Sequence, residues 1–345
     1  MLGSPTSKYY SVHVTPRGAN DARPTALRIV NDEKLEGKWA DKVIMVTGGS
    51  AFVGAETVRA LHATGATVYM TVRDTAKAQK VIDDIFKSDP TNKAPIYMIT
   101  MTLDELDSVR QGAEKFLKQS GNKLNLLVCN AGVMATPYAL TRDGYETQFA
   151  TNYLSHFLLF QLLKPALLAS STPAYNSRVV MVASESHRMG EVRFQDYSFT
   201  QGYHPVKAYG QSKTATIYMA NTIDRRFGAE GLHALSLHPG AIRSNLTAHV
   251  RKFADPMWEL PAVKAREKTA AQGAATIVYA AVSRDWEGNG GRYLSNCMEM
   301  GPCLGKEGIE VMDEGYAPWA YDQEKEDKLW ADSLKMVGIE EESEE

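Results

Sequence analysis

Short apolar runs alternate with longer segments of helical periodicity between residues 42 and 238. Short runs of mostly apolar residues bounded by turn residues predict buried strands, whereas apolar positions spaced three and four apart predict helices. The predicted strands are 42–47, 67–72, 96–100, 124–128, 178–182 and 233–238. The predicted helices are 55–64, about 75–87, 104–118, about 144–168 and 206–227.

This alternation predicts an α/β fold. Strands that are apolar throughout, each followed by a helix, indicate a parallel sheet covered on both faces. Right-handed crossovers then give a doubly wound, Rossmann-type sheet with helices on both sides. No repeat or linker divides residues 36–337, which are predicted to form a single domain. Residues 1–35 are polar and carry prolines, so we expect a loosely structured extension, and residues 338–345 form an acidic C-terminal tail.

Composition excludes several classes of function. A net charge of −3 over 345 residues, without a basic stripe, argues against nucleic acid as a main partner. The three cysteines fit no metal spacing and no disulfide framework, which favours reduced thiols in a cytoplasmic protein. The first twenty residues lack the apolar core of a signal peptide, and the most apolar run, 157–163, is too short to span a bilayer. We therefore expect no metal site and no transmembrane segment.

The first predicted strand runs into a glycine-rich turn, Thr47-Gly-Gly-Ser-Ala-Phe-Val-Gly54. Such a turn, at the start of a helix, presents backbone N–H groups and the positive end of the helix dipole to a pyrophosphate. A plain tight turn between strand and helix is the alternative. Its position after the first strand of a doubly wound sheet favours a dinucleotide.

Arg73 follows the second predicted strand. NAD sites place an acidic residue near this point to bind the ribose 2′-hydroxyl, whereas a cation suits the 2′-phosphate of NADP. Ser50 in the glycine turn could add a hydroxyl. Asp74 keeps NAD open, and an arginine that is merely solvated is the other alternative. The sequence favours NADP over NAD.

Tyr209 and Lys213 lie four residues apart and therefore share one face of a helix. A fixed ammonium there favours the phenolate, so we expect it to lower the tyrosine pKa toward neutral and to make a general acid/base of the side chain. Aromatic and basic residues also meet by chance at this spacing on surface helices. Ser184 follows the strand that ends at Val182, at the sheet edge where active sites of open α/β sheets lie.

The chain resembles the short-chain dehydrogenase/reductase family over residues 38–335. Its motifs occur in the family's order: the turn at 47–54, Asn130-Ala131-Gly132, Asn152, Ser184, Tyr209-x-x-x-Lys213 and Pro239-Gly240. Three features resemble the retinol-dehydrogenase and WW-domain-oxidoreductase-like branch, including its fungal members. They are the wide gap between Ser184 and Tyr209, the sequence Cys-Asn-Ala-Gly, and the sequence Gly-Tyr-Ala-Pro-Trp-Ala-Tyr at 315–321.

The resemblance implies a division of labour. Tyr209 would pass a proton to or from the substrate oxygen while Ser184 holds that oxygen. Lys213 would bind the nicotinamide ribose, and Asn152 would hold a water that links Lys213 to solvent. The cofactor contacts would come from Gly48, Ser50, Phe52, Val53, Gly54, Arg73, Thr102, Leu103, Asn130, Ala131, Gly132, Tyr209, Lys213, Pro239, Gly240, Ile242 and Ser244.

Two positions depart from the family pattern. Compact members read Thr-Gly-x-x-x-Gly-x-Gly, so Phe52 stands where a glycine is expected. The turn also resembles the extended members' Thr-Gly-Gly-x-Gly-Phe-Ile-Gly, in which the aromatic residue is ordinary and only Ala51 differs. Thr102-Leu103 replaces the usual Asp-Leu beside the adenine.

The implied function is an NADP(H)-dependent oxidoreductase acting on a lipophilic ketone, aldehyde or secondary alcohol in secondary-metabolite biosynthesis. The apolar residues of the segment 245–268, among them Met257, Trp258, Leu260 and Pro261, would form a lid over the substrate. The alternative, motivated by Phe52 and Thr102, is a cofactor-binding scaffold with little turnover, or a redox-neutral isomerase or dehydratase. The helices at 144–168 and 206–227 could pair in a homodimer, or belong to the core.

Overall fold

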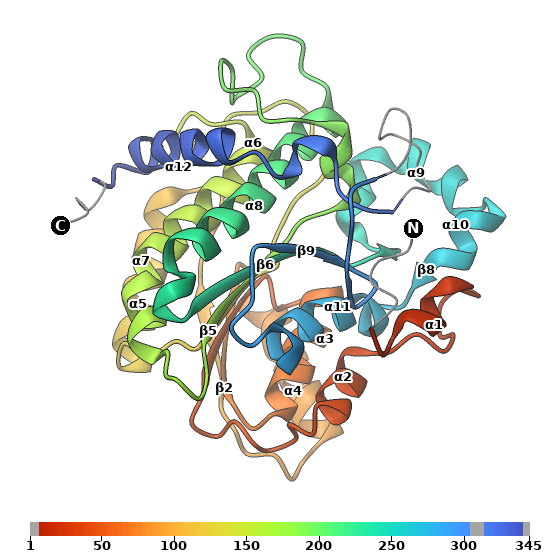
Figure 1. Cartoon of the computed structure of the whole chain (residues 1–345), viewed down its shortest axis with the longest axis vertical. Coiled ribbons are helices and arrows are strands. Elements are labelled where there is room, and N and C mark those ends of the chain that lie inside the picture. Colours follow the sequence, from red (N-terminus) through yellow and green to blue (C-terminus); the bar gives the residue numbers. More distant parts are fainter. Residues whose placement is uncertain (1–6, 304–313, 341–345) are drawn as a thin grey trace.

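The computed structural model describes residues 7–303 and 314–340, which build a central sheet with helices on both faces (Figure 1). The strand order within these residues is β10-β9-β6-β5-β4-β1-β2-β3, and every pair is parallel except β9 with β10. The predicted doubly wound sheet is thus confirmed. Its strands are β1 (Val43–Thr47), β2 (Thr67–Val72), β3 (Ile96–Thr100), β4 (Leu126–Cys129), β5 (Ser177–Val182), β6 (Leu232–His238), β9 (Arg292–Ser295) and β10 (Met298–Glu299).

The central strands are apolar throughout because each of their faces meets a core. In β1, Ile44 and Val46 belong to one apolar cluster and Met45 to the other, as the alternation of side chains along a strand requires. In the edge strand β3, four of the five residues are exposed or half-buried, and only Ile99 is fully buried. The position of a strand in the sheet therefore explains how apolar its sequence is.

Helices of the first core are α5 (Leu106–Ser120), α7 (Ser155–Ser170), α8 (Pro205–Phe227) and α12 (Gln323–Val337), and those of the second are α3 (Phe52–Ala63), α4 (Thr75–Ser88) and α11 (Ala270–Val282). The helix predicted over 144–168 is interrupted. A short α6 (Thr147–Phe149) leads into a π-helical turn (Ala150–Leu154) before α7 begins. Asn152 lies inside that turn, so its neighbourhood differs from an ordinary helix interior.

The expectation of a loosely structured N-terminal extension is wrong for residues 7–35. These residues form α1 (Tyr10–Val14) and α2 (Ala26–Asp32), and Ile29 and Val30 of α2 are fully buried in the second core. The apolar positions 26, 29 and 30 have helical spacing, but the run is too short to stand out among polar residues. The boundary at residue 35 stays a prediction, and residues 341–345 of the acidic tail lie outside the described residues.

The segment predicted as a lid, 245–268, follows β6 and the short strand β7 (Ala241–Ile242). It contains a 3-10 turn (Asn245–Val250), α9 (Arg251–Trp258), α10 (Pro261–Arg266) and β8 (Glu267–Lys268), which pairs in parallel with β7. Figure 1 shows this segment at the edge of the molecule near α1. None of the helices in the described part of the chain is long and apolar enough to cross a membrane.

Candidate active site

Hydrogen bonds connect the glycine turn after β1 to the loop that follows β4. The hydroxyl Oγ1 of Thr47 accepts hydrogen bonds from the backbone N–H of Asn130 at 2.9 Å and of Ala131 at 3.0 Å. In return, the amide of Asn130 donates to the carbonyl of Thr47 at 2.9 Å and of Gly48 at 3.4 Å. The two parallel strands thus end in one connected polar structure at the carboxyl edge of the sheet, where ligands of such sheets bind.

Glycines at two positions let this turn fold tightly. Gly48 has a φ of +69°, which favours glycine. A Cβ on Gly54 would overlap the carbonyl oxygen of Gly48 and would lie 2.8 Å from Asn130 Nδ2. The turn therefore brings the start of α3 close against the end of β1, which leaves the helix N-terminus facing the crevice.

Phe52 is the first residue of α3, and its φ is +44°. A residue with a bulky side chain rarely adopts this left-handed backbone, which costs about 1–2 kcal/mol. Its ring is 43% exposed. The compact family pattern places a glycine here, and the positive φ gives the physical reason for that glycine. The backbone gives no support to the extended-pattern alternative, in which an aromatic residue at this position is ordinary.

The residues predicted around the adenosine lie after β2 and β3. Arg73 is exposed in the turn between β2 and α4. Asp74 caps α4, since its Oδ1 accepts from the backbone N–H of Lys77 at 2.9 Å. Thr102 is half-buried and its N–H donates to Ser108 Oγ at 2.9 Å, while Leu103 is buried. The Asp74 carboxylate is therefore already engaged with the backbone of α4, whereas the Arg73 side chain is not.

Ser184, Tyr209 and Lys213 come together in a buried cluster. Their residues are 8%, 4% and 4% exposed, and the Ser184 side chain is close enough to the Tyr209 phenol to lower its pKa. Ser184 Oγ also accepts from the backbone N–H of Ser186 at 3.1 Å, which caps the 3-10 turn after β5. Lys213 lies one turn beyond Tyr209 on α8, with Nζ 5.6 Å from the centroid of the phenol ring. The predicted convergence of these three side chains is what the structure shows.

The expected lowering of the tyrosine pKa is wrong for this arrangement. Burial raises the pKa of Tyr209 to about 12, the hydrogen bond from Ser184 lowers it, and the charge of Glu185 raises it further. Burial also lowers the pKa of Lys213 to about 8. The ammonium donates to the carbonyl of Val182 at 2.7 Å instead of to the phenol, so desolvation is the stronger influence on both groups.

The side chain of Asn152 holds the β4 loop against α8. Its Oδ1 accepts from the N–H of Val133 at 2.8 Å, and its Nδ2 donates to the carbonyl of Val133 and to Ser212 Oγ, both at 2.9 Å. A Cβ on Gly132 would lie 3.0 Å from Asn152 Oδ1 and 3.6 Å from Lys213 Nζ, so Asn152 and Lys213 flank the same glycine. The water-holding role implied for Asn152 stays a prediction, because these hydrogen bonds fix the loop.

His156 connects the glycine turn with the cluster. Its Nδ1 donates to the carbonyl of Asn152 at 2.9 Å, since that carbonyl can only accept. Its Nε2 then accepts from Thr47 Oγ1, also at 2.9 Å. Burial lowers the pKa of His156 to about 4, which fits a neutral ring with both nitrogens in use.

The loop after β6 carries the last predicted cofactor contacts. Pro239 and Gly240 are half-buried, and Ser244 Oγ accepts from the N–H of Leu246 at 3.2 Å. Ile242 packs beside α11, because a Cβ on Gly273 would lie 2.7 Å from its side chain and 3.2 Å from Val53. This contact brings the loop alongside the start of α3 and the glycine turn.

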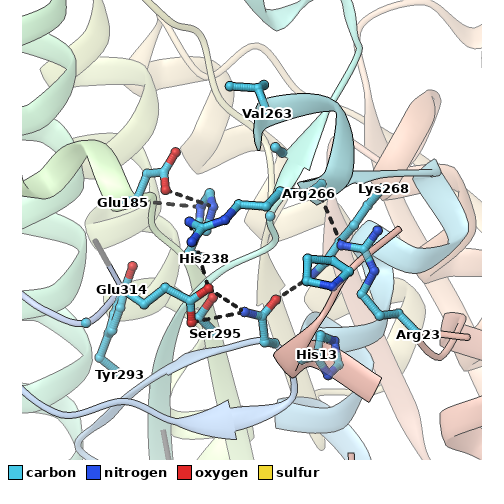
Figure 2. A pocket seen from close by; sticks show the side chains of 15 residues that line it. His13, Arg23, Glu185, His238, Val263, Arg266, Lys268, Tyr293, Ser295 and Glu314 are labelled. Carbon is cyan, nitrogen blue, oxygen red and sulfur yellow. Dashed lines mark hydrogen bonds and ion pairs between the residues drawn. The ribbon is translucent and has the colours of Figure 1, made fainter. Parts of the chain in front are cut away.

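A pocket lies at the carboxyl ends of β6 and β9, and Figure 2 shows the side chains that line it. The sequence did not predict it, because apart from Gly240 and Gly315 its lining residues belong to no motif. The lining residues are His13, Pro16, Arg23, Glu185, His238, Gly240, Ala241, Val263, Arg266, Lys268, Tyr293, Ser295, Asn296, Glu314 and Gly315. The apolar lid residues Met257 and Leu260 are not among them and are 41% and 52% exposed. Nowhere in the described ranges do three His, Cys, Asp or Glu side chains form a group that could hold a metal ion.

Comparisons with known proteins agree with the motifs. The family model described as short chain dehydrogenase matches residues 42–255. The oxidoreductase calI of Penicillium decumbens is 46% identical over 97% of this chain and 99% of its own length. Retinol dehydrogenase 12 of Mus musculus is 33% identical over 86% of this chain and 87% of its own. A solved structure from Mycobacterium paratuberculosis has a TM-score of 0.65 at 30% identity and covers 92% of this chain and 99% of its own.

Proposed function

This chain belongs to the short-chain dehydrogenase family, and from that premise we propose that it is an NADP(H)-dependent oxidoreductase. It transfers a hydride between the nicotinamide and a ketone, aldehyde or secondary alcohol on a lipophilic skeleton. The observation that carries the proposal is the buried cluster of Ser184 and Tyr209, in which the serine lowers the pKa of the phenol, with Lys213 one helical turn away. It lies at the same sheet edge as the glycine turn.

The residues present fit a dinucleotide. The cradle between Gly48 and Gly54 has no room for a Cβ at residue 54, and the turn exposes the N-terminus of α3. The glycine turn would hold the pyrophosphate, Lys213 the nicotinamide ribose, and the loop around Ile242 and Ser244 the carboxamide. When bound, the cofactor supplies or accepts the hydride.

Tyr209 acts as the proton donor in the direction of reduction. A tyrosine with a pKa of about 12 is protonated at neutral pH, and it can give its proton to a carbonyl oxygen that Ser184 holds by a second hydrogen bond. Lys213, with a pKa of about 8, is mostly charged at pH 7 and stabilises the phenolate that remains. Burial of all three side chains excludes water, which strengthens each of these interactions.

The choice of NADP over NAD rests on Arg73. The side chain is exposed after β2, where a 2′-phosphate would lie, whereas Asp74 is engaged as the cap of α4. Ser50, half-buried in the glycine turn, supports the same choice as a further hydroxyl donor. A guanidinium suits a phosphate because it offers paired N–H donors and a permanent charge.

One observation favours a second candidate. Phe52 combines a strained backbone with an exposed ring at the start of α3, next to where the pyrophosphate would bind. If that ring excludes the cofactor from its productive position, the protein is a binding scaffold, or a redox-neutral isomerase or dehydratase. The two candidates separate cleanly, because only the first consumes NADPH in proportion to alcohol formed.

We further propose a biological role and a substrate class for the enzyme. The likeness to the Penicillium protein supports a role in fungal secondary-metabolite biosynthesis. The partially exposed apolar residues Leu246, Met257 and Leu260 along the 245–268 segment support a lipophilic substrate, which they would cover. A cytoplasmic location and a homodimer remain our proposals from the sequence.

The test is a panel of ketones and aldehydes offered with NADPH and, separately, with NADH. We expect oxidation of NADPH with a subset of the panel and slower turnover with NADH. Replacing Arg73 by Glu should reverse the preference, while the same charge change at the exposed Lys80 of α4 should leave it unaltered. Equal use of both cofactors by the wild type and both variants would refute the assignment of Arg73.

A further inference from the structure

The pocket of Figure 2 has walls from several parts of the chain, including the N-terminal segment. Glu185 forms part of its wall and directly follows Ser184, so this wall is next in the chain to the serine of the catalytic cluster. On its opposite side lie His13 and Arg23 of the N-terminal segment. The family model begins only at residue 42, so this wall is built by a part of the chain that precedes the matched region.

Lys268 is the most unusual residue of this pocket. It is 4% exposed and lies in the wall of the pocket (Figure 2). Its ammonium donates to Asn296 Oδ1 at 2.9 Å and to the carbonyl of Pro239 at 3.4 Å. No carboxylate of the described residues lies within 4.0 Å of it. Buried charges in proteins are normally paired, because an isolated one costs several kcal/mol of desolvation. Burial accordingly lowers the pKa of Lys268 to about 8.

Arg266 brings a second cation to the same space. Its side chain is 34% exposed, and its ion pair with Glu314 is at 4.0 Å, beyond hydrogen-bond distance. Glu314 is already engaged, since both of its oxygens accept from Asn296 Nδ2, at 3.3 and 3.4 Å. The carboxylate therefore does not satisfy the guanidinium fully. Burial raises the pKa of Glu314, while the charges of Arg266 and Lys268 lower it.

The backbone that carries these two cations is held rigidly by the N-terminal segment. Arg23 is buried, and its guanidinium donates to the carbonyls of Arg266 at 3.0 Å, Glu267 at 2.7 Å and Gly18 at 2.9 Å, while its Nε pairs with Asp21. These bonds use four of the five N–H donors of Arg23, so its main role is to support the pocket. Lys268 and Arg266 are thus preorganised, which reduces the entropy cost of binding.

We propose that this pocket is an anion subsite, in which Lys268 and Arg266 bind the carboxylate of an acidic small molecule. This assignment rests on the proposed function. The acid group is the remote end of a substrate whose reacting oxygen lies at Ser184. Glu185 and Glu314 line the same pocket and select against a second anion. The substrate is therefore an oxo acid or hydroxy acid and not a wholly apolar compound.

The test is calorimetric binding of two matched pairs, benzoate with benzamide and butyrate with butyramide, to the full chain. We expect the acids to bind the wild type at least tenfold more tightly than the amides. Lys268→Met should weaken the acids by about ten- to a hundredfold, because a charge-assisted hydrogen bond is lost, and leave the amides within twofold. Arg266→Gln, at a more exposed position, should show a smaller loss of the same kind.

Lys264→Met is the matched control. Lys264 belongs to the same segment, is 52% exposed, pairs with Glu259 at 2.6 Å and does not line the pocket. Equal affinity of acids and amides for the wild type, or undiminished acid binding by Lys268→Met, would overturn the proposal. So would a tenfold loss of NADPH affinity in Lys268→Met with acid binding intact, since the anion would then be the cofactor's phosphate. NADPH binding and turnover, measured separately, show whether the proposed function fails on its own.

Discussion

The catalytic cluster and the glycine turn lie on the same sheet edge, yet they are built in opposite ways. Ser184, Tyr209 and Lys213 are buried and hydrogen-bonded to their surroundings. The turn ends in Phe52, which is exposed and has a left-handed backbone. Packing therefore fixes the residues that would handle the proton, whereas the turn that would meet the cofactor's phosphates carries strain at Phe52. The cluster is the well-packed half of this site, and the cofactor cradle is the half that departs from the family pattern.

The largest effect should come from Tyr209→Phe. Removing the general acid should lower kcat by about 10²–10⁴-fold, because Phe has no proton to transfer to the substrate oxygen. The affinity for NADPH should stay within about twofold. Tyr97→Phe, at a 46% exposed tyrosine of β3, is the control and should be neutral. Normal turnover by Tyr209→Phe would remove the cluster from the mechanism.

The substitution Gly54→Ala tests the glycine turn. The new methyl group would overlap the carbonyl of Gly48 and crowd Asn130 Nδ2, so the turn must shift. We expect a loss of about 1–3 kcal/mol in the free energy of unfolding and at least a tenfold loss of NADPH affinity. Gly301→Ala, where a Cβ meets nothing within 4 Å, is the control in denaturant and cofactor titrations. An unaltered NADPH affinity would show that the cradle is looser than its contacts indicate.

His156, which joins the two regions, makes the fold sensitive to acid. Its pKa is about 4 in the folded chain and 6.5 in the unfolded chain. Between these values only the unfolded state binds the proton, so the contribution of His156 to stability is complete above pH 6.5 and is lost as the pH falls toward 4. The loss is on the order of 2–3 kcal/mol. In urea unfolding, the stability difference between the wild type and His156→Gln should therefore narrow from pH 7 to pH 4.5, and a constant difference would refute this link.

Phe52 should give the smallest effect, with the opposite sign. Phe52→Gly removes a left-handed φ from a residue with a side chain and should add about 1 kcal/mol to the free energy of unfolding. We expect NADPH to bind several-fold more tightly. Phe52→Ala is the matched variant, because it removes the ring and keeps the Cβ. If both variants gain affinity equally, the ring is the obstruction; if only the glycine variant gains, backbone strain is the cause; if neither gains, the turn already suits the cofactor.

The sequence predicted the sheet well because its central strands are buried on both faces and are therefore apolar throughout. β2 and β3 have the predicted bounds, and Tyr209 and Lys213 share the predicted helix face. The π-helical turn at Asn152 left no sequence signal, since it depends on bonds to Val133 and Ser212 that form only in the folded chain.

Long-range contacts also explain what the sequence could not predict. The pocket around Lys268 is assembled from residues up to about three hundred positions apart, so no local motif marks it. The pKa of Tyr209 was expected to fall because the spacing to Lys213 is visible in the sequence, whereas the burial that raises it is not. Likewise, α2 is stabilised by packing into the second core, which its short polar sequence does not reveal.

The central claim is that this sheet edge binds NADP(H) for hydride transfer at Tyr209. The most direct measurement is a fluorescence titration of the wild-type protein with NADPH and, in parallel, with NADH. We expect saturable binding of NADPH with a Kd in the micromolar range, at about the usual scale of enzyme affinities, and weaker binding of NADH. No binding of NADPH at millimolar concentration would contradict the account.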